Sequence, residues 1–311
     1  MSIGILDITS HVPEGRRDVE AMAESFSMSK EFRVEKLGTD QLPVASEDED
    51  ACGLAVAAVD ALLKRNPDLE DRIGMLVVVT QNPAGHGLPH TAALVHAATG
   101  LGRDVAAFDL SLGCSGYVHG LEVVTRFLEG RPSDKRHGIL VTSDPYSKVV
   151  DPTDRDTAML FGDAATATLI GPNPVLEMST ADFMTDGTKC DAIVVDDGVL
   201  SMKGRKVFNF VMSNVPGQIE RALGEAGLRV ADMDRLLFHQ GSRYIVETLA
   251  NRVGADLDRT PVRIGETGNT VSSSIPLLLE RELGDESVGK LLIAGFGVGL
   301  SSGVGVLIRP Q

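Results

Sequence analysis

Three residues whose side chains could act on an acyl group lie far apart in this 311-residue sequence: Cys114, His239 and Asn269. Each comes at or just after a stretch that is typical of a buried strand. A cysteine thiolate is a nucleophile for acyl groups, whereas an imidazole and a carboxamide can donate hydrogen bonds to a developing oxyanion or enolate. We therefore expect thioester chemistry if the fold brings these side chains together.

Cys114 stands among small residues in the stretch DLSLGCSGYVHG, which covers residues 109–120. A helix is predicted from residue 115 onwards, so the helix dipole and free backbone N–H groups would favour the thiolate. Gly113, Ser115 and Gly116 would let a substrate carbonyl approach closely. The alternative interpretation is that Cys114 is a small buried hydrophobic residue.

His239 and Asn269 also have simpler interpretations, since His239 could merely cap the following helix and Asn269 could merely suit its turn. The glycine-rich loop GFGVG, residues 295–299, could present backbone N–H groups or could be an ordinary turn between two strands. The combination of all these features is more specific than any one of them.

Composition narrows the possible partners. The chain has 29 basic and 44 acidic residues, a net charge of −15, which disfavours nucleic acid and anionic membranes as partners. No run of 18 apolar residues and no signal peptide is visible, so we expect a cytoplasmic protein. Three scattered cysteines predict neither a disulfide framework nor a metal site.

Alternation of apolar runs predicts an α/β fold. The acidic run at 46–51 should open the first helix, since carboxylates suit a helix N-terminus. Helices are expected at 51–65, 88–101, 115–128, 215–228 and 242–254. Strands are expected at 73–80, 105–110, 138–144, 233–241, 260–265, 290–300 and 303–310, with a short strand pair ending at 164–172.

The order of these elements repeats, which predicts two duplicated α/β halves at residues 1–171 and 172–311. The strand before Cys114 corresponds to 260–265 before Asn269, and the strand at 73–80 corresponds to the one that ends at His239. In such folds, sites form where strand C-termini meet helix N-termini. The first half would then supply Cys114, and the second would supply His239 and Asn269.

The sequence resembles the ketoacyl-acyl-carrier-protein synthase III family, the condensing enzymes of the thiolase superfamily. The resemblance covers nearly the whole chain, although the first 50 residues match weakly. It implies a thiolase-like fold with layers in the order α-β-α-β-α. The stretches that carry it are FDLSLGCSGYVHGL (108–121), DPTDRDTAMLFGDAATATLIG (151–171), FHQGSRYIVETLANRVG (238–254), GETGNT (265–270) and GFGVGLSSG (295–303).

The resemblance implies that acyl-CoA loads Cys114 and that malonyl-ACP, or malonyl-CoA, then condenses with the acyl group after losing CO₂. His239 and Asn269 would polarise the malonyl thioester carbonyl. The backbone N–H of Cys114 and one N–H from Gly297, Val298 or Gly299 would form an oxyanion hole. No permanently bound cofactor and no metal are implied, and a homodimer is expected.

Further contacts are implied in the same way. Arg155 and Phe32 would flank the adenine of coenzyme A, and Ser242 stands where the family has an asparagine. The alternative for Arg155 is a surface ion pair with a nearby aspartate, Asp151 or Asp154.

Leu88 would lie at the dimer interface and close the end of the partner's acyl pocket. Departures from the family pattern, such as Asn209 in place of a lysine, weaken or move the surface that would dock the acyl carrier protein. The replacement basic residues would be Arg205, Lys206, Arg243 and Arg252. These departures indicate a specialised member of the family.

Two other functions remain open from the sequence. A thiolase-fold acyltransferase would pass the acyl group from Cys114 to an amine or alcohol of another metabolite, with His239 as general base. An inactive subunit would only shape a heterodimer. The retained Asn269 favours condensation, because simple acyl transfer needs no enolate donor. Acyl chain length, the acceptor and the pathway are not determined by the sequence.

Overall fold

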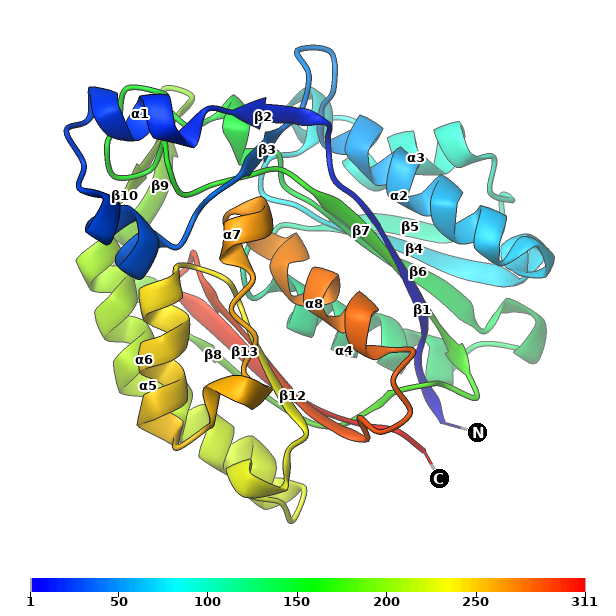
Figure 1. Cartoon of the computed structure of the whole chain (residues 1–311). Coiled ribbons are helices and arrows are strands. Elements are labelled where there is room, and N and C mark those ends of the chain that lie inside the picture. The colour runs from blue at the N-terminus through cyan, green and yellow to red at the C-terminus, as the bar shows by residue number, and fades with distance from the viewer. Residues whose placement is uncertain (1, 311) are drawn as a thin grey trace.

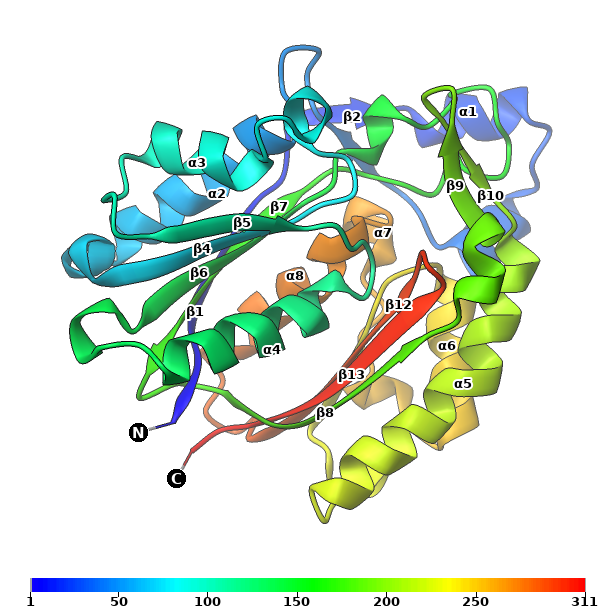
Figure 2. The same ribbon diagram turned by 180° about the vertical axis from the view of Figure 1, so that it is seen from behind.

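In the computed structural model, which describes residues 2–310, two β-sheets alternate with three layers of helices (Figure 1). The middle layer, seen between the sheets in Figure 2, holds α4 (Gly116–Glu129) and α8 (Ser274–Glu282). One outer layer holds α2 (Ala51–Arg65) and α3 (Thr91–Thr99), and the other holds α5 (Gly204–Glu225) and α6 (Arg243–Val253). The predicted α-β-α-β-α architecture is thus confirmed.

The first sheet has five strands in the order β1-β7-β6-β4-β5. Strands β4, β5 and β6 pair in parallel, while β7 pairs antiparallel with both β6 and β1. Helices cover both faces, which explains the continuous apolar run of β4. The strands are β1 (Ile3–His11), β4 (Ile73–Val79), β5 (Ala106–Leu110), β6 (His137–Ser143) and β7 (Ala165–Pro172).

The second sheet has four strands in the order β11-β12-β13-β8 and repeats the same pattern of pairing without a counterpart of β5. Here β11 and β12 are parallel, and β13 pairs antiparallel with β12 and β8. The strands are β8 (Glu177–Thr185), β11 (Arg235–Phe238), β12 (Lys290–Gly297) and β13 (Ser301–Ile308).

The strand expected at 260–265 is wrong, and this is why the second sheet has one strand fewer. Residues 261–263 belong to no helix or strand and lead into the short helix α7 (Ile264–Thr267). Pro261 has no N–H to give to a ladder. The carbonyl of Gly265 instead accepts hydrogen bonds from the backbone of Asp40 and Gln41, at 3.3 and 3.0 Å.

Two other expectations need correction. The helix expected at 215–228 begins earlier, at Gly204, and runs through Pro216, because Val207, Phe210 and Val211 extend its buried stripe. The short strand pair expected to end at 164–172 is a single strand, β7, and residues 151–160 before it form turns.

Smaller elements that were not expected from the sequence pattern complete the main part of the fold. They are α1 (Val19–Ser25), the antiparallel pair β2 (Gly15–Arg17) and β3 (Leu42–Val44), and the hairpin of β9 (Ile193–Asp196) and β10 (Val199–Met202). The hairpin turns at Asp197 and Gly198, whose positive φ values of 47° and 80° suit a tight two-residue turn.

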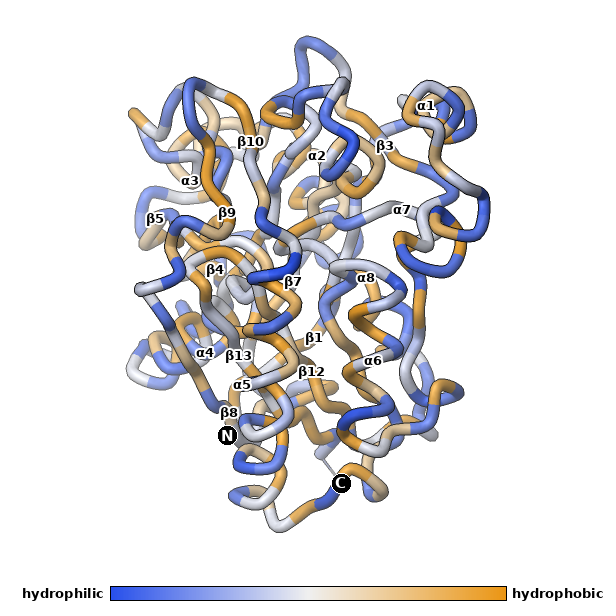
Figure 3. The backbone as a smooth tube through the Cα atoms, turned by 90° about the vertical axis from the view of Figure 1, so that its left-hand side faces the viewer, coloured by the Kyte–Doolittle hydropathy of each residue, from blue (hydrophilic) through white to orange (hydrophobic). Residues whose placement is uncertain are grey.

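Helices α5 and α6 alternate between hydrophobic and hydrophilic residues along their length (Figure 3), as expected for helices that cover one face of a sheet. The first turn of α2 begins as predicted from the acidic run, since the Asp50 carboxylate accepts the backbone N–H groups of Cys52 and Gly53. Within residues 2–310, every helix is too short or too polar to cross a lipid bilayer.

Candidate active site

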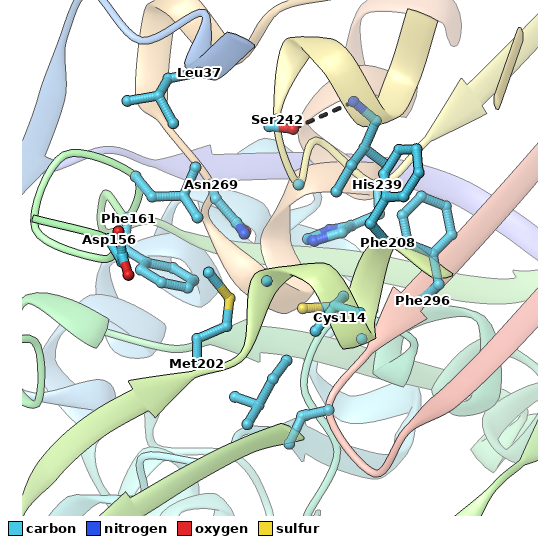
Figure 4. A pocket seen from close by; sticks show the side chains of 18 of the residues that line it. Leu37, Cys114, Asp156, Phe161, Met202, Phe208, His239, Ser242, Asn269 and Phe296 are labelled. Carbon is cyan, nitrogen blue, oxygen red and sulfur yellow. Dashed lines mark hydrogen bonds between the residues drawn. The ribbon is translucent and has the colours of Figure 1, made fainter. Parts of the chain in front are cut away.

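Cys114, His239 and Asn269 line one cavity of about 330 Å³. Figure 4 shows the His239 ring and the Asn269 amide nitrogen facing each other across this cavity, with the Cys114 side chain beside them. The three side chains come from the end of β5, the end of β11 and the loop before α8. The convergence expected from the sequence is therefore present in the structure.

The backbone around Cys114 is tightly packed. A Cβ atom on Gly297 would lie 2.8 Å from Cys114 Sγ, and one on Gly295 would lie 2.5 Å from the Cys114 carbonyl oxygen. Only glycine therefore fits at these two positions. The adjacent Ser115, which precedes α4, bonds to Ser301 at the start of β13, with 2.8 Å between their hydroxyl oxygens.

The thiol of Cys114 is more strongly protonated than the sequence predicts. Burial, together with the buried carboxylate of Asp144, raises its pKa to about 12. The backbone N–H groups of Cys114 and Val298 act in the opposite direction, but burial outweighs them. In the free protein, burial of the sulfur therefore opposes the thiolate that the small residues and the helix start favour.

His239 is buried and neutral, since burial lowers its pKa to about 3. Its Nδ1 lies 2.7 Å from the hydroxyl of Ser274, which also accepts the backbone N–H of Gln240 at 3.3 Å. Because the hydroxyl oxygen of Ser274 accepts that N–H through a lone pair, its own proton can point at Nδ1 of His239. This arrangement favours the tautomer with its proton on Nε2, which makes Nε2 a hydrogen-bond donor.

Asn269 is held through its backbone by the opposite half of the chain. Its N–H donates to the carbonyl of Leu160 at 2.8 Å, and its carbonyl accepts the N–H of Gly162 at 3.2 Å. Its Oδ1 accepts the backbone N–H of Val271 at 2.9 Å. This orientation leaves the amide N–H₂ group as the end that can serve a ligand in the cavity.

Asp144, which the sequence analysis did not single out, lies buried behind this site. It accepts hydrogen bonds from the Gln81 backbone N–H at 2.7 Å, the Thr80 hydroxyl at 3.3 Å and the Ser272 hydroxyl. Burial raises its pKa to about 6. The partner Ser272 lies 128 residues away in sequence, so no local pattern could have identified the contact.

The rest of the cavity wall is mostly apolar, and sequence reasoning missed it because its members come from segments that lie far apart in the sequence. At its mouth, Tyr244 stacks on Phe208 with ring centroids 5.4 Å apart, and Lys36 Nζ lies 3.9 Å from the Tyr244 centroid. Other missed lining residues are Leu37, Tyr146, Asp156, Leu160, Phe161, Ile193, Met202, Val207, Ile245 and Phe296.

Of the expected coenzyme contacts, only Ser242 lines the cavity, where its hydroxyl also caps α6 by accepting the Ile245 N–H at 3.2 Å. Phe32 is 44% exposed and lies outside the lining, as does the exposed Arg155. Within residues 2–310, Arg155 forms no ion pair, so the alternative pairing with a neighbouring aspartate is wrong. Leu88 is 88% exposed.

The basic residues expected to dock a carrier lie on α5 and α6. Arg205 lines the cavity, whereas Lys206 pairs with Asp191 at 2.8 Å and Arg243 pairs with Glu247 at 3.3 Å. Arg252 lies in the last turn of α6. In the described part of the chain, no three His, Cys, Asp or Glu side chains gather in a way that could hold a metal ion.

Known proteins that resemble this chain in sequence are condensing enzymes of one family. Residues 108–187 match the family model of 3-oxoacyl-(acyl-carrier-protein) synthase III, and residues 223–309 match the model of its C-terminal part. The β-ketoacyl-(acyl-carrier-protein) synthase III 2 of Deinococcus radiodurans is 31% identical over 98% of this chain and 94% of its own length. A synthase III of Deinococcus deserti is 32% identical, over 97% and 89%.

Solved structures of the same kind share the fold. A 3-oxoacyl-(acyl-carrier-protein) synthase from Burkholderia xenovorans superposes with a TM-score of 0.91 at 31% identity, covering 99% of this chain and 94% of that one. A priming β-ketosynthase of a polyketide biosynthetic pathway gives 0.87 at 26% identity, over 100% and 97%. With both family models matched and these relatives covered almost end to end, the chain belongs to the 3-oxoacyl-(acyl-carrier-protein) synthase III family.

Proposed function

We propose that this protein catalyses a decarboxylative Claisen condensation. An acyl group from acyl-CoA loads Cys114, and a malonyl thioester, carried by acyl carrier protein or coenzyme A, extends it to a 3-oxoacyl thioester. The single observation that carries the proposal is the shared cavity of Cys114, His239 and Asn269. No permanent cofactor takes part.

In the loading step, Cys114 Sγ forms a bond to the thioester carbon and the bond from that carbon to the coenzyme sulfur breaks. The thiol proton leaves with the coenzyme, which departs as free thiol. The backbone N–H groups of Cys114 and Val298 are placed to stabilise the oxyanion, since both already act on the sulfur. A neutral thiol is the resting form, so the proton moves only when the acyl group arrives.

In the condensation step, the bond from the malonyl α-carbon to its carboxylate breaks and CO₂ leaves. His239 Nε2–H and the Asn269 amide donate hydrogen bonds to the enolate oxygen that results. The enolate carbon attacks the acyl carbon, and the bond to Cys114 Sγ breaks. The sulfur then takes a proton from solvent.

The neutral state of His239 supports this function over the acyltransferase. An acyltransferase needs an imidazole that accepts a proton from an amine or alcohol, and a pKa near 3 makes His239 a poor base. A donor pair of imidazole and amide has no task in simple acyl transfer. A heterodimer subunit without activity needs none of the three side chains.

The test is acyl transfer followed by CO₂ release. Incubation with acyl-CoA should add one acyl mass to the intact protein, and Cys114→Ala should abolish the adduct while the exposed Cys190→Ala keeps it. Addition of malonyl carrier should then release CO₂ and the 3-oxoacyl product. An adduct that is passed to an amine without CO₂ release would establish the acyltransferase instead.

We also propose that the protein acts as a homodimer. Strand β5 is a free edge strand that is only partly buried throughout, and Leu88 is almost fully exposed. Both features are typical of a surface that a second copy covers. Light scattering should give twice the mass of 33.0 kDa, and Leu88→Asp should lower it.

A further inference from the structure

A second cavity of about 260 Å³ adjoins the first, and Tyr146, Ile193 and Val298 line both. Its outer wall includes β9, where Val194 and Val195 are exposed. Because Val298 also supplies the N–H that acts on the Cys114 sulfur, this cavity lies next to the proposed nucleophile. If Cys114 carries an acyl group, the second cavity can receive the end of that group.

Gln81 lines this cavity, and the oxygen of its carboxamide is buried without a partner. Its backbone N–H is fixed by Asp144 at 2.7 Å, but its buried Oε1 has no hydrogen-bond partner among residues 2–310. A Cβ atom on Gly113 would lie 2.6 Å from Oε1, so the amide oxygen packs against the residue that precedes Cys114. A buried acceptor without a donor has lost its hydrogen bond to water and gained none in return, so a ligand that donates to it is favoured.

The neighbouring wall adds a second polar group without a partner. The Tyr146 hydroxyl makes no hydrogen bond within residues 2–310, and burial keeps its pKa well above the usual value, so it holds its proton. Asn82 differs, because its Nδ2 already donates to the Pro145 carbonyl at 2.9 Å. Val149, Val195 and Leu200 supply the apolar part of the wall.

We propose that the acyl group loaded on Cys114 carries a hydroxyl group that hydrogen-bonds to the carboxamide of Gln81. This inference rests on the proposed function and narrows its substrate class from plain alkyl to hydroxyacyl thioesters. A plain alkyl chain would leave the Gln81 amide buried and unpaired, which a site built for a polar substrate discriminates against.

A hydroxyl suits this wall better than other polar groups, because it both donates and accepts. It can bond to Gln81 through either end of the amide, and it can accept from Tyr146 with its remaining lone pair. A charged group has no counter-ion among the lining residues. The volume of about 260 Å³ exceeds the roughly 150 Å³ that holds a benzene molecule, so a short hydroxyacyl chain fits.

The experiment compares loading of Cys114 by butanoyl-CoA, 3-hydroxybutanoyl-CoA and 4-hydroxybutanoyl-CoA, measured as kcat/KM by intact mass. The wild-type protein should prefer at least one hydroxyacyl substrate over butanoyl about tenfold, the ratio that one hydrogen bond supplies. In Gln81→Met, which keeps the side-chain length and removes the amide, the preference should fall below about twofold. The preference should fall because kcat/KM for the hydroxyacyl substrate decreases, while kcat/KM for butanoyl-CoA stays the same.

Val199→Ala is the control, since Val199 is exposed on β10 and lines neither cavity, and it should leave the preference unchanged. Equal loading of butanoyl and hydroxyacyl groups by the wild type would overturn the inference while the proposed function stands, as when water simply pairs with Gln81. So would a preference that survives in Gln81→Met. Failure of every acyl-CoA to load would overturn the proposed function and this inference with it.

Discussion

Cys114 and Asn269, which the repeated order of elements predicts at corresponding places in two halves, are held in different ways. Cys114 follows strand β5 of its own sheet and begins its own helix region. Asn269 follows no strand, and both of its backbone hydrogen bonds run to Leu160 and Gly162 of the other half. The same half also binds the next residues, since Ser272 donates to Asp144 and Ser273 donates to the carbonyl of Ala164.

The difference teaches which parts of the site depend on the docking of the halves. Among the described residues, the backbone of the donor amide is bound only by Leu160 and Gly162 of the first half, whereas the nucleophile follows a strand of its own half and is packed by Gly295 and Gly297 of the second. The contacts of Leu160 and Gly162 therefore act on Asn269 and not on Cys114. Damage to those contacts should therefore spare acyl loading and remove condensation. Four substitutions test this, in order of decreasing expected effect.

Asn269→Ala removes the donor itself. We expect decarboxylation of malonyl thioester to fall by about 10²–10³, the usual effect of deleting one donor to an oxyanion. Loading of Cys114 should change less than threefold, roughly the error of such context-dependent effects. Rates of CO₂ release and of adduct formation measure the two steps, with the exposed Asn251→Ala as control. Equal loss in both steps would refute the division of labour.

Asp144→Asn removes the buried charge that joins the halves. The pKa of Asp144 is raised from 3.8 to about 6, so its contribution to stability is present below about pH 4 and is lost as the pH rises through about 6. Two units correspond to about 3 kcal/mol. Urea unfolding at pH 4.5 and 7.5 should therefore show the wild type losing stability relative to the variant. A constant difference would show that Asp144 does not titrate in this range.

Gly162→Ala disturbs the pair of backbone hydrogen bonds that Leu160 and Gly162 make with Asn269, which we call the clamp on Asn269. A Cβ there would lie 2.1 Å from the Thr267 carbonyl oxygen, so the two segments must move apart. We expect about 1–3 kcal/mol of destabilisation and a fall in condensation that exceeds the fall in loading. Thermal unfolding and the two rates measure this. Gly187→Ala, which meets no atom within 4 Å, is the matched control.

Ser274→Ala leaves the clamp on Asn269 intact and removes the hydroxyl that favours the Nε2-protonated tautomer of His239. Without the hydroxyl, Nδ1 can take the proton from Nε2, and condensation should fall about tenfold, the loss that corresponds to about 1.4 kcal/mol. The rate of Cys114 loading should not change. If loading falls instead, Ser274 acts on the nucleophile and not on the imidazole.

Sequence reasoning reached the side chains that stand in distinctive local surroundings. Cys114 is flanked by small residues, and His239 and Asn269 come at matching places in a repeated order of elements. It failed at 260–265, where an apolar stretch looks like a strand but has no neighbour to pair with. Local propensity cannot report a missing partner.

It also missed Asp144 and Gln81, for a related reason. Nothing in the neighbouring residues marks either side chain. The role of Asp144 depends on Ser272, and the environment of Gln81 is set by Gly113, more than 30 residues away. Contacts of this kind exist only after the chain has folded, so a single sequence carries no pattern for them.

Because Leu160 and Gly162 hold Asn269 from the other half of the chain, mixing two fragments of the protein would measure how well the halves dock. A polypeptide severed at the exposed Asn173, between β7 and β8, would leave Cys114 on one piece and His239 with Asn269 on the other. Because the amide takes its place only against Leu160 and Gly162, reassembly of the two pieces and recovery of turnover would follow the same titration curve.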